Sequence, residues 1–97
     1  MVSKINLSKR ISEIRHQRSS NVIALVNGHA VKLARRFGKP DWTRNDQEDE
    51  VFISFVGQQR IQLRDETIEL NEGELVVIPK GVEYRPVPMG HAELLTI

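Results

Sequence analysis

The alternation of apolar and polar residues divides the chain into one short helical segment followed by a series of short strands. Leu7, Ile11 and Ile14 recur at helical spacing, and Ser8 is a residue type that caps helix starts. This pattern predicts a helix over Ser8–Arg18. We interpret its polar face as solvated rather than as a binding site for a polyanion, although that face carries four basic residues: Lys9, Arg10, Arg15 and Arg18.

Beyond residue 20 the chain consists of short runs rich in β-branched residues that are separated by turn residues. The runs predict about eight strands, at residues 22–26, 30–37, 50–56, 60–64, 67–70, 74–79, 82–87 and 92–97. Turn-forming groups such as Asn27-Gly28, Gly57-Gln58 and Pro88-Met89-Gly90 separate them. This many short antiparallel strands in 97 residues predicts an all-β sandwich or barrel, and the number suits a small jelly roll.

The third run, "EVFISFV", is apolar on one face and mixed on the other. The mixed face carries Glu50, Phe52, Ser54 and Val56, and the apolar face carries Val51, Ile53 and Phe55. If the mixed face points into the barrel, the apolar face lies outside and needs a cover. Either the N-terminal segment or a second copy of the chain can supply it. We predict a homodimer through Val51, Ile53 and Phe55.

Composition removes several classes of partner and site. The formal charge is +1, from 14 Lys and Arg against 13 Asp and Glu, so no overall field favours nucleic acid or a membrane as a partner. The chain has no cysteine, which excludes a disulfide framework, a thiolate nucleophile and a thiolate zinc site. No apolar run has the length of a signal peptide or a membrane helix. We therefore expect one cytoplasmic domain.

Two stretches resemble known motifs. "WTRNDQEDEVFISFVGQQRIQL" followed by "GELVVIPKGVEYRPV" resembles the cupin superfamily, in particular the small single-domain cupins often labelled mannose-6-phosphate isomerase-like. The resemblance covers nearly the whole chain and implies a single cupin domain over residues 1–97, with a first motif at about 42–57 and a second at about 73–84. The implied fold is a cupin jelly-roll barrel (a double-stranded β-helix) with a short N-terminal helix.

The resemblance also implies a divalent metal, held by two histidines and a glutamate of the first motif and a histidine of the second. The corresponding positions in this chain are Thr43, Asn45, Glu50 and Tyr84. Hydroxyl, amide and phenol groups are poor ligands for first-row transition ions, which neutral imidazoles and carboxylates bind. We therefore predict no bound metal and no cofactor. His91 is the candidate substitute ligand, but we interpret it, like His16 and His29, as a polar loop residue.

Without a metal, a buried Glu50 must find hydrogen-bond donors or take up a proton. The donors expected near it are Tyr84, Asn45 and one of two arginines, Arg35 or Arg36. Two interpretations stay open: a ligand pocket, or a structural cluster that replaces the metal. Trp42 and Phe52 either pack the barrel, which the low aromatic content favours, or form a wall for a sugar ring. The candidate ligand-binding residues are Trp42, Thr43, Asn45, Glu50, Phe52 and Tyr84.

The leading functional hypothesis is a cupin that binds a small polar ligand, a sugar or a carboxylate-like compound, without the usual metal. The first alternative is a metal-independent isomerase, epimerase or lyase acting on a sugar or keto acid, with Glu50 as base and Tyr84 as acid. A second is a degenerate metal-dependent enzyme that recruits His91, and a third is a regulatory protein that uses the basic helix. The sequence leaves open whether the protein is an enzyme.

Overall fold

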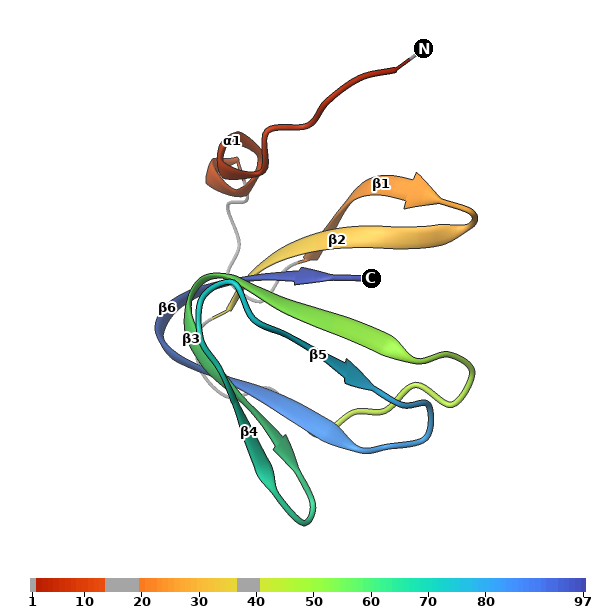
Figure 1. Ribbon diagram of the computed structural model, residues 1–97, viewed down its shortest axis with the longest axis vertical. Helices are drawn as coiled ribbons and strands as arrows, with labels where there is room; N and C mark the ends of the chain where they lie inside the picture. Colours follow the sequence, from red (N-terminus) through yellow and green to blue (C-terminus); the bar gives the residue numbers. More distant parts are fainter. Residues whose placement is uncertain (1, 14–19, 37–40) are drawn as a thin grey trace.

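The structure, a computed structural model, describes residues 2–13, 20–36 and 41–97. Within these ranges it has one helix and six strands: α1 (Leu7–Ser12), β1 (Ser20–Val26), β2 (His29–Arg36), β3 (Glu50–Leu63), β4 (Thr67–Leu70), β5 (Leu75–Ile78) and β6 (Tyr84–Thr96). The predicted all-β class with a short N-terminal helix is confirmed (Figure 1). No helix in the described ranges has the length and apolar character needed to cross a bilayer.

Helix α1 begins one residue earlier than the predicted Ser8–Arg18 and ends at Ser12, where Glu13 is the C-cap. Its N-cap is Asn6, whose Oδ1 accepts a hydrogen bond from the backbone N–H of Lys9 at 3.0 Å. This bond satisfies one of the N–H groups that a helix start leaves without an intrahelical acceptor. Ser8, the predicted cap, therefore lies inside the helix. Segment 14–19 lies outside the described residues, and with it three residues named above: Arg15, His16 and Arg18.

Two of the predicted breaks are irregularities inside long strands, so the described chain has six strands rather than eight. All strand pairs are antiparallel, in the order β1-β2-β6-β3-β4, and β5 also pairs with β3. The register of β3 against β6 shifts between Ser54 and Gln58. Gly57 and Gly90 have φ values of 78° and 83°, which a glycine adopts in a bulge as readily as in a turn. The two strands therefore bend at these points and continue.

Because β3 and β6 are long, both belong to two facing layers (Figure 1). The first half of β3 pairs with β5 and with the end of β6, and β1 and β2 extend this layer. The second half of β3 pairs with β4 and with the start of β6. Side chains from both layers meet between them in one buried cluster: Phe52, Ile61, Leu70, Ile78, Tyr84 and Leu94. This cluster is the core of the barrel.

Helix α1 covers part of the outer face of the first layer. Its Ile11 packs on Leu33 of β2, and three half-buried neighbours surround this pair: Leu7, Ile23 and Leu95. The predicted apolar face of β3 remains half-buried at Val51, Ile53 and Phe55. Beside it on β5, Leu75 and Val77 are 58% and 50% exposed. The helix therefore leaves part of the apolar face open to solvent.

Candidate functional site

Glu50 and Tyr84 form the centre of the candidate site. They are the first residues of β3 and β6, and the Tyr84 hydroxyl donates a hydrogen bond to Oε1 of Glu50 at 2.7 Å. The ring of Phe52 meets the Tyr84 ring edge-on, with centroids 5.1 Å apart and an interplanar angle of 62°. Among the donors expected for Glu50, the structure therefore shows Tyr84. Packing on Phe52 fixes the direction from which this hydroxyl approaches the carboxylate.

A cavity of about 110 Å³ adjoins Glu50 at the end of the barrel where β3 begins and β6 ends. We call it the mouth cavity. Strand β2 contributes His29 and Lys32 to its wall, the loop before β3 contributes Glu48 and Asp49, and β6 contributes Thr96. Glu50 is half-buried in this wall. The mouth cavity thus places a carboxylate acceptor, oriented by Tyr84, beside other polar groups. Convergent polar groups of this kind fix the orientation of a bound ligand.

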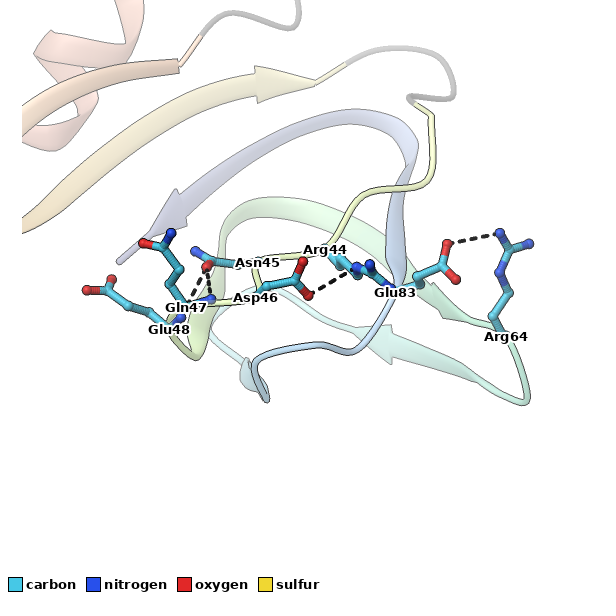
Figure 2. Close-up of polar contacts among 7 residues, drawn as sticks. All are labelled: Arg44, Asn45, Asp46, Gln47, Glu48, Arg64 and Glu83. Carbon is cyan, nitrogen blue, oxygen red and sulfur yellow. Dashed lines mark hydrogen bonds and ion pairs between the residues drawn. The ribbon is translucent and has the colours of Figure 1, made fainter.

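Asn45 serves the loop that leads into β3. Its Oδ1 accepts hydrogen bonds from the backbone N–H groups of residues 47 and 48, at 2.9 and 3.0 Å (Figure 2). Its backbone carbonyl accepts the N–H of Gly81 at 2.7 Å. Nearby, Oδ1 of Asp49 accepts the N–H of Lys80 at 2.8 Å. These bonds fix the loop of the first motif on the turn of the second, and they occupy the side-chain oxygen of Asn45.

Thr43 is brought next to Tyr84 by its backbone. The two residues form an isolated antiparallel bridge, with each N–H donating to the other's carbonyl at 2.9 Å. Directly paired residues of antiparallel segments lie on the same face, so Thr43 shares the side of the layer that holds Tyr84. Its side chain is exposed. Thr43 is thus close to the Glu50–Tyr84 pair in the fold, at its solvent side.

Trp42 lies on the opposite side of its segment from Thr43, because side chains alternate along an extended chain. The guanidinium carbons of Arg64 and Arg85 lie 3.9 and 4.7 Å from the centroid of its ring. Arg64 also binds Glu83 at 3.1 Å (Figure 2). Trp42 therefore packs against arginines on the outer surface, whereas Phe52 packs in the core, and the two rings do not form a common wall.

The donor set does not fit the transition metal that the family resemblance implies. The Asn45 amide oxygen already accepts two backbone N–H groups, and the Tyr84 hydroxyl is a donor to Glu50. In the part of the chain that the structure describes, no three His, Cys, Asp or Glu side chains are grouped so that they could hold a metal ion. We assign no chemical step to a metal. The side chains of Arg35, Arg36 and His91 lie outside what the structure describes.

Two residues of the barrel were not identified from the sequence. Lys32 lines the mouth cavity. It could have been identified because it is a charged residue in the middle of the apolar run "AVKLA". Gln59 is fully buried on β3, and both atoms of its amide lack a hydrogen-bond partner in the described structure. Gln59 could have been identified because it is two residues from Ile61, a core residue, and therefore points to the same inner face of β3. Both positions carry polar groups where the strand pattern calls for apolar ones.

Comparison with known proteins identifies the family. No protein-family model matches the chain. The crystal structure of a cupin-2 domain containing protein from Shewanella frigidimarina is 36% identical to it, has a TM-score of 0.91, and aligns over 95% of this chain and 90% of that one. The chain belongs to the cupin family. This cupin also shares its fold, at 13% identity and a TM-score of 0.78, with a cupin superfamily protein from Desulfitobacterium hafniense, over 99% of this chain and 91% of that one.

A curated relative is the uncharacterized protein YdbB of Bacillus subtilis. It is 35% identical to this cupin over 81 residues, which are 82% of this chain and 72% of YdbB. The resemblance to cupins and the predicted cupin fold are confirmed by these comparisons. The narrower resemblance to the mannose-6-phosphate isomerase-like group stays a prediction.

Proposed function

We propose that this cupin binds a small polar molecule, a sugar or a carboxylate-like compound, in the mouth cavity and without a metal. One observation supports this most directly: Glu50 lines the mouth cavity while Tyr84 donates to its Oε1. The bond orients the carboxylate, and its Oε2 accepts no hydrogen bond from the described residues, so a ligand can supply a donor. Thr96 adds a hydroxyl to the same wall. A pre-oriented acceptor in a concave site reduces the ordering cost of binding.

A thermal-shift screen against sugars, sugar phosphates and small carboxylic acids tests the proposal. A ligand present at about one hundred times its Kd stabilises the folded state by about 2.7 kcal/mol, which raises the Tm. We expect at least one compound to do this for the wild type and not for Glu50→Gln. Glu66→Gln is the matched control, because it makes the same change in the exposed turn before β4. Equal responses of all three proteins would contradict a site at Glu50.

The metal-free part of the proposal has its own measurement. Elemental analysis of protein purified without chelators is expected to give far less than one transition metal per chain. A value near one per chain would contradict it, because the chain would then hold a transition metal despite the few suitable ligands around Glu50.

The Glu50–Tyr84 hydrogen bond favours one second candidate, a metal-independent isomerase or epimerase. In such an enzyme Glu50 takes a proton from the substrate and Tyr84 supplies one, and their separation of 2.7 Å lets the two residues exchange a proton between turnovers. Proton exchange at a substrate carbon, followed in deuterium oxide by NMR, separates catalysis from binding. Loss of this exchange in both Glu50→Gln and Tyr84→Phe would favour the enzyme.

We also propose that a second copy of the chain covers the open apolar face. Its exposed members are Leu75 and Val77 of β5 and Ile97, and they adjoin half-buried Val51 and Ile53 of β3. None of these five side chains is charged, so two copies of the face can meet without like-charged side chains opposing each other. A charged partner would find no complementary charge in this row.

Substitution in this row tests the dimer. Light scattering is expected to give twice the chain mass for the wild type and the chain mass for Val77→Lys, because two lysines would then face each other across the symmetry axis. Thr67→Lys adds the same charge to β4 in the other layer, at an exposed site, and is expected to stay dimeric. A monomeric wild type would exclude the dimer.

A further inference from the structure

We propose that the ligand of the mouth cavity is a short amino or hydroxy acid, whose carboxylate binds Lys32 and whose ammonium or hydroxyl group donates to Glu50. This inference rests on the proposed function, because it names the ligand class of the same site. It adds Lys32 as the residue that selects for a carboxylate.

Strand register places Lys32 on the inner side of the first layer. Lys32 of β2 is opposite Thr96 of β6, and Thr96 is opposite Phe52 of β3. Directly paired residues share a face of the sheet, and Phe52 belongs to the core cluster. The lysine therefore rises on the face that bears the core, and it reaches solvent because this row is at the end of the barrel.

Glu50 lies on the same inner face, two residues before Phe52 on β3. Strand β6 lies between β3 and β2, so these two strands are two strand spacings apart, about 10 Å. Glu50 is displaced from the row of Lys32, Thr96 and Phe52 by two residues along β3. Thr96 lies between them and lines the same wall. The two charges thus stand on opposite sides of the mouth cavity, with a hydroxyl between them.

Neither charge is neutralised by the other. No ion pair of Lys32 or Glu50 is found among the described residues. Glu50 makes its hydrogen bond to the neutral Tyr84 hydroxyl. Beyond these two residues, His29 stands on the β2 side, and Glu48 and Asp49 stand on the β3 side. A molecule with an anionic end and a donor end matches both walls, whereas a molecule with only one of these ends matches one wall at most.

The size of the mouth cavity limits this ligand. Its volume of about 110 Å³ is small beside the roughly 300–1,000 Å³ of pockets for drug-sized ligands. It therefore suits a compound of a few carbons. Because the walls carry both signs of charge, discrimination between compounds of this size is expected to depend on their end groups.

A matched set of three-carbon probes tests the inference by calorimetry and thermal shift. Alanine, β-alanine and lactate carry both kinds of end group, propionate and propylamine carry one each, and propane-1,2-diol carries hydroxyls only. We expect at least one of the first three to bind the wild type at least tenfold more tightly than the other probes. Lys32→Met is expected to weaken that binding at least tenfold. Lys80→Met, which removes a lysine that does not line the mouth cavity, is expected to leave it unchanged.

Three outcomes would overturn the inference: equal or tighter binding of propionate, propylamine or the diol, unchanged binding by Lys32→Met, or no response to any of the six probes. The experiment tests the proposed function separately from the ligand class. If a neutral sugar stabilises the wild type but not Glu50→Gln, the mouth cavity is a ligand site and only the dipolar ligand is wrong. If Glu50→Gln responds like the wild type to every compound of the screen and to all six probes, both the proposed function and the dipolar ligand are wrong.

Discussion

Replacing Leu94 by alanine is expected to lower the free energy of unfolding by about 2–5 kcal/mol. Leu94 is fully buried in the core cluster. It is opposite Ser54 on β3 and Ala34 on β2, both small residues, so its side chain fills space that no neighbour can take over. The loss of stability therefore combines the lost transfer free energy of the removed methyl groups with the cost of an unfilled cavity. Chemical denaturation monitored by Trp42 fluorescence measures it.

Leu25→Ala provides the matched control for this experiment. The same atoms are removed, but Leu25 is 72% exposed on the edge strand β1 and lies outside the proposed dimer face. Its expected effect is within about 0.5 kcal/mol. If the two variants lost the same stability, the assignment of the barrel interior would be wrong.

Gln59→Met is expected to raise the free energy of unfolding by about 1–3 kcal/mol, against the usual direction of core substitutions. The Gln59 side chain is fully buried, and neither amide atom has a partner in the described structure. The unfolded chain hydrates this amide, and folding removes that hydration without replacement. Methionine has a similar length and no strong hydrogen-bonding group, so it avoids that cost while it fills nearly the same volume.

Gln58→Met tests whether position or residue type is responsible. Gln58 is exposed, and its Nε2 donates to Oδ1 of Asn71 at 2.6 Å. Its replacement is expected to lower stability by at most about 1 kcal/mol. A loss of stability in Gln59→Met, measured by the same denaturation, would show that the buried amide is satisfied after all, for example by an enclosed water.

The sequence pattern predicted the fold class because alternation and turn residues carry most of the information about an antiparallel barrel. It overcounted strands at Gly57 and Gly90. A glycine with positive φ looks the same in sequence whether it ends a strand or bends one. Only the pairing of β3 with β6 on both sides of each bend distinguishes the two cases, and that pairing joins residues far apart in the chain. The helix cap was misplaced because Asn6 and Ser8 are both good capping residues.

At the site, family spacing identified Glu50 and Tyr84 as neighbours, and the structure has them in direct contact. The same spacing could not say how the other positions are used. Asn45 binds backbone N–H groups of its own loop, and the spacing does not specify such bonds. Trp42 stacks with Arg64 and Arg85, which lie outside both motifs. Lys32 could not be identified from the motifs because it lies outside both of them. Only the pairing of β2 with β6 brings it to the mouth cavity.

Strands β3 and β6 each run through both layers of the barrel. Loss of strand pairing in one layer is therefore expected to spread to the other layer, because the same two strands continue from one into the other. Such a protein is expected to unfold in one cooperative step. It is also expected to fold slowly for its size, since its central ladder joins residues from 21 (Leu63 and Tyr84) to 44 (Phe52 and Thr96) positions apart along the chain and gains little from local contacts.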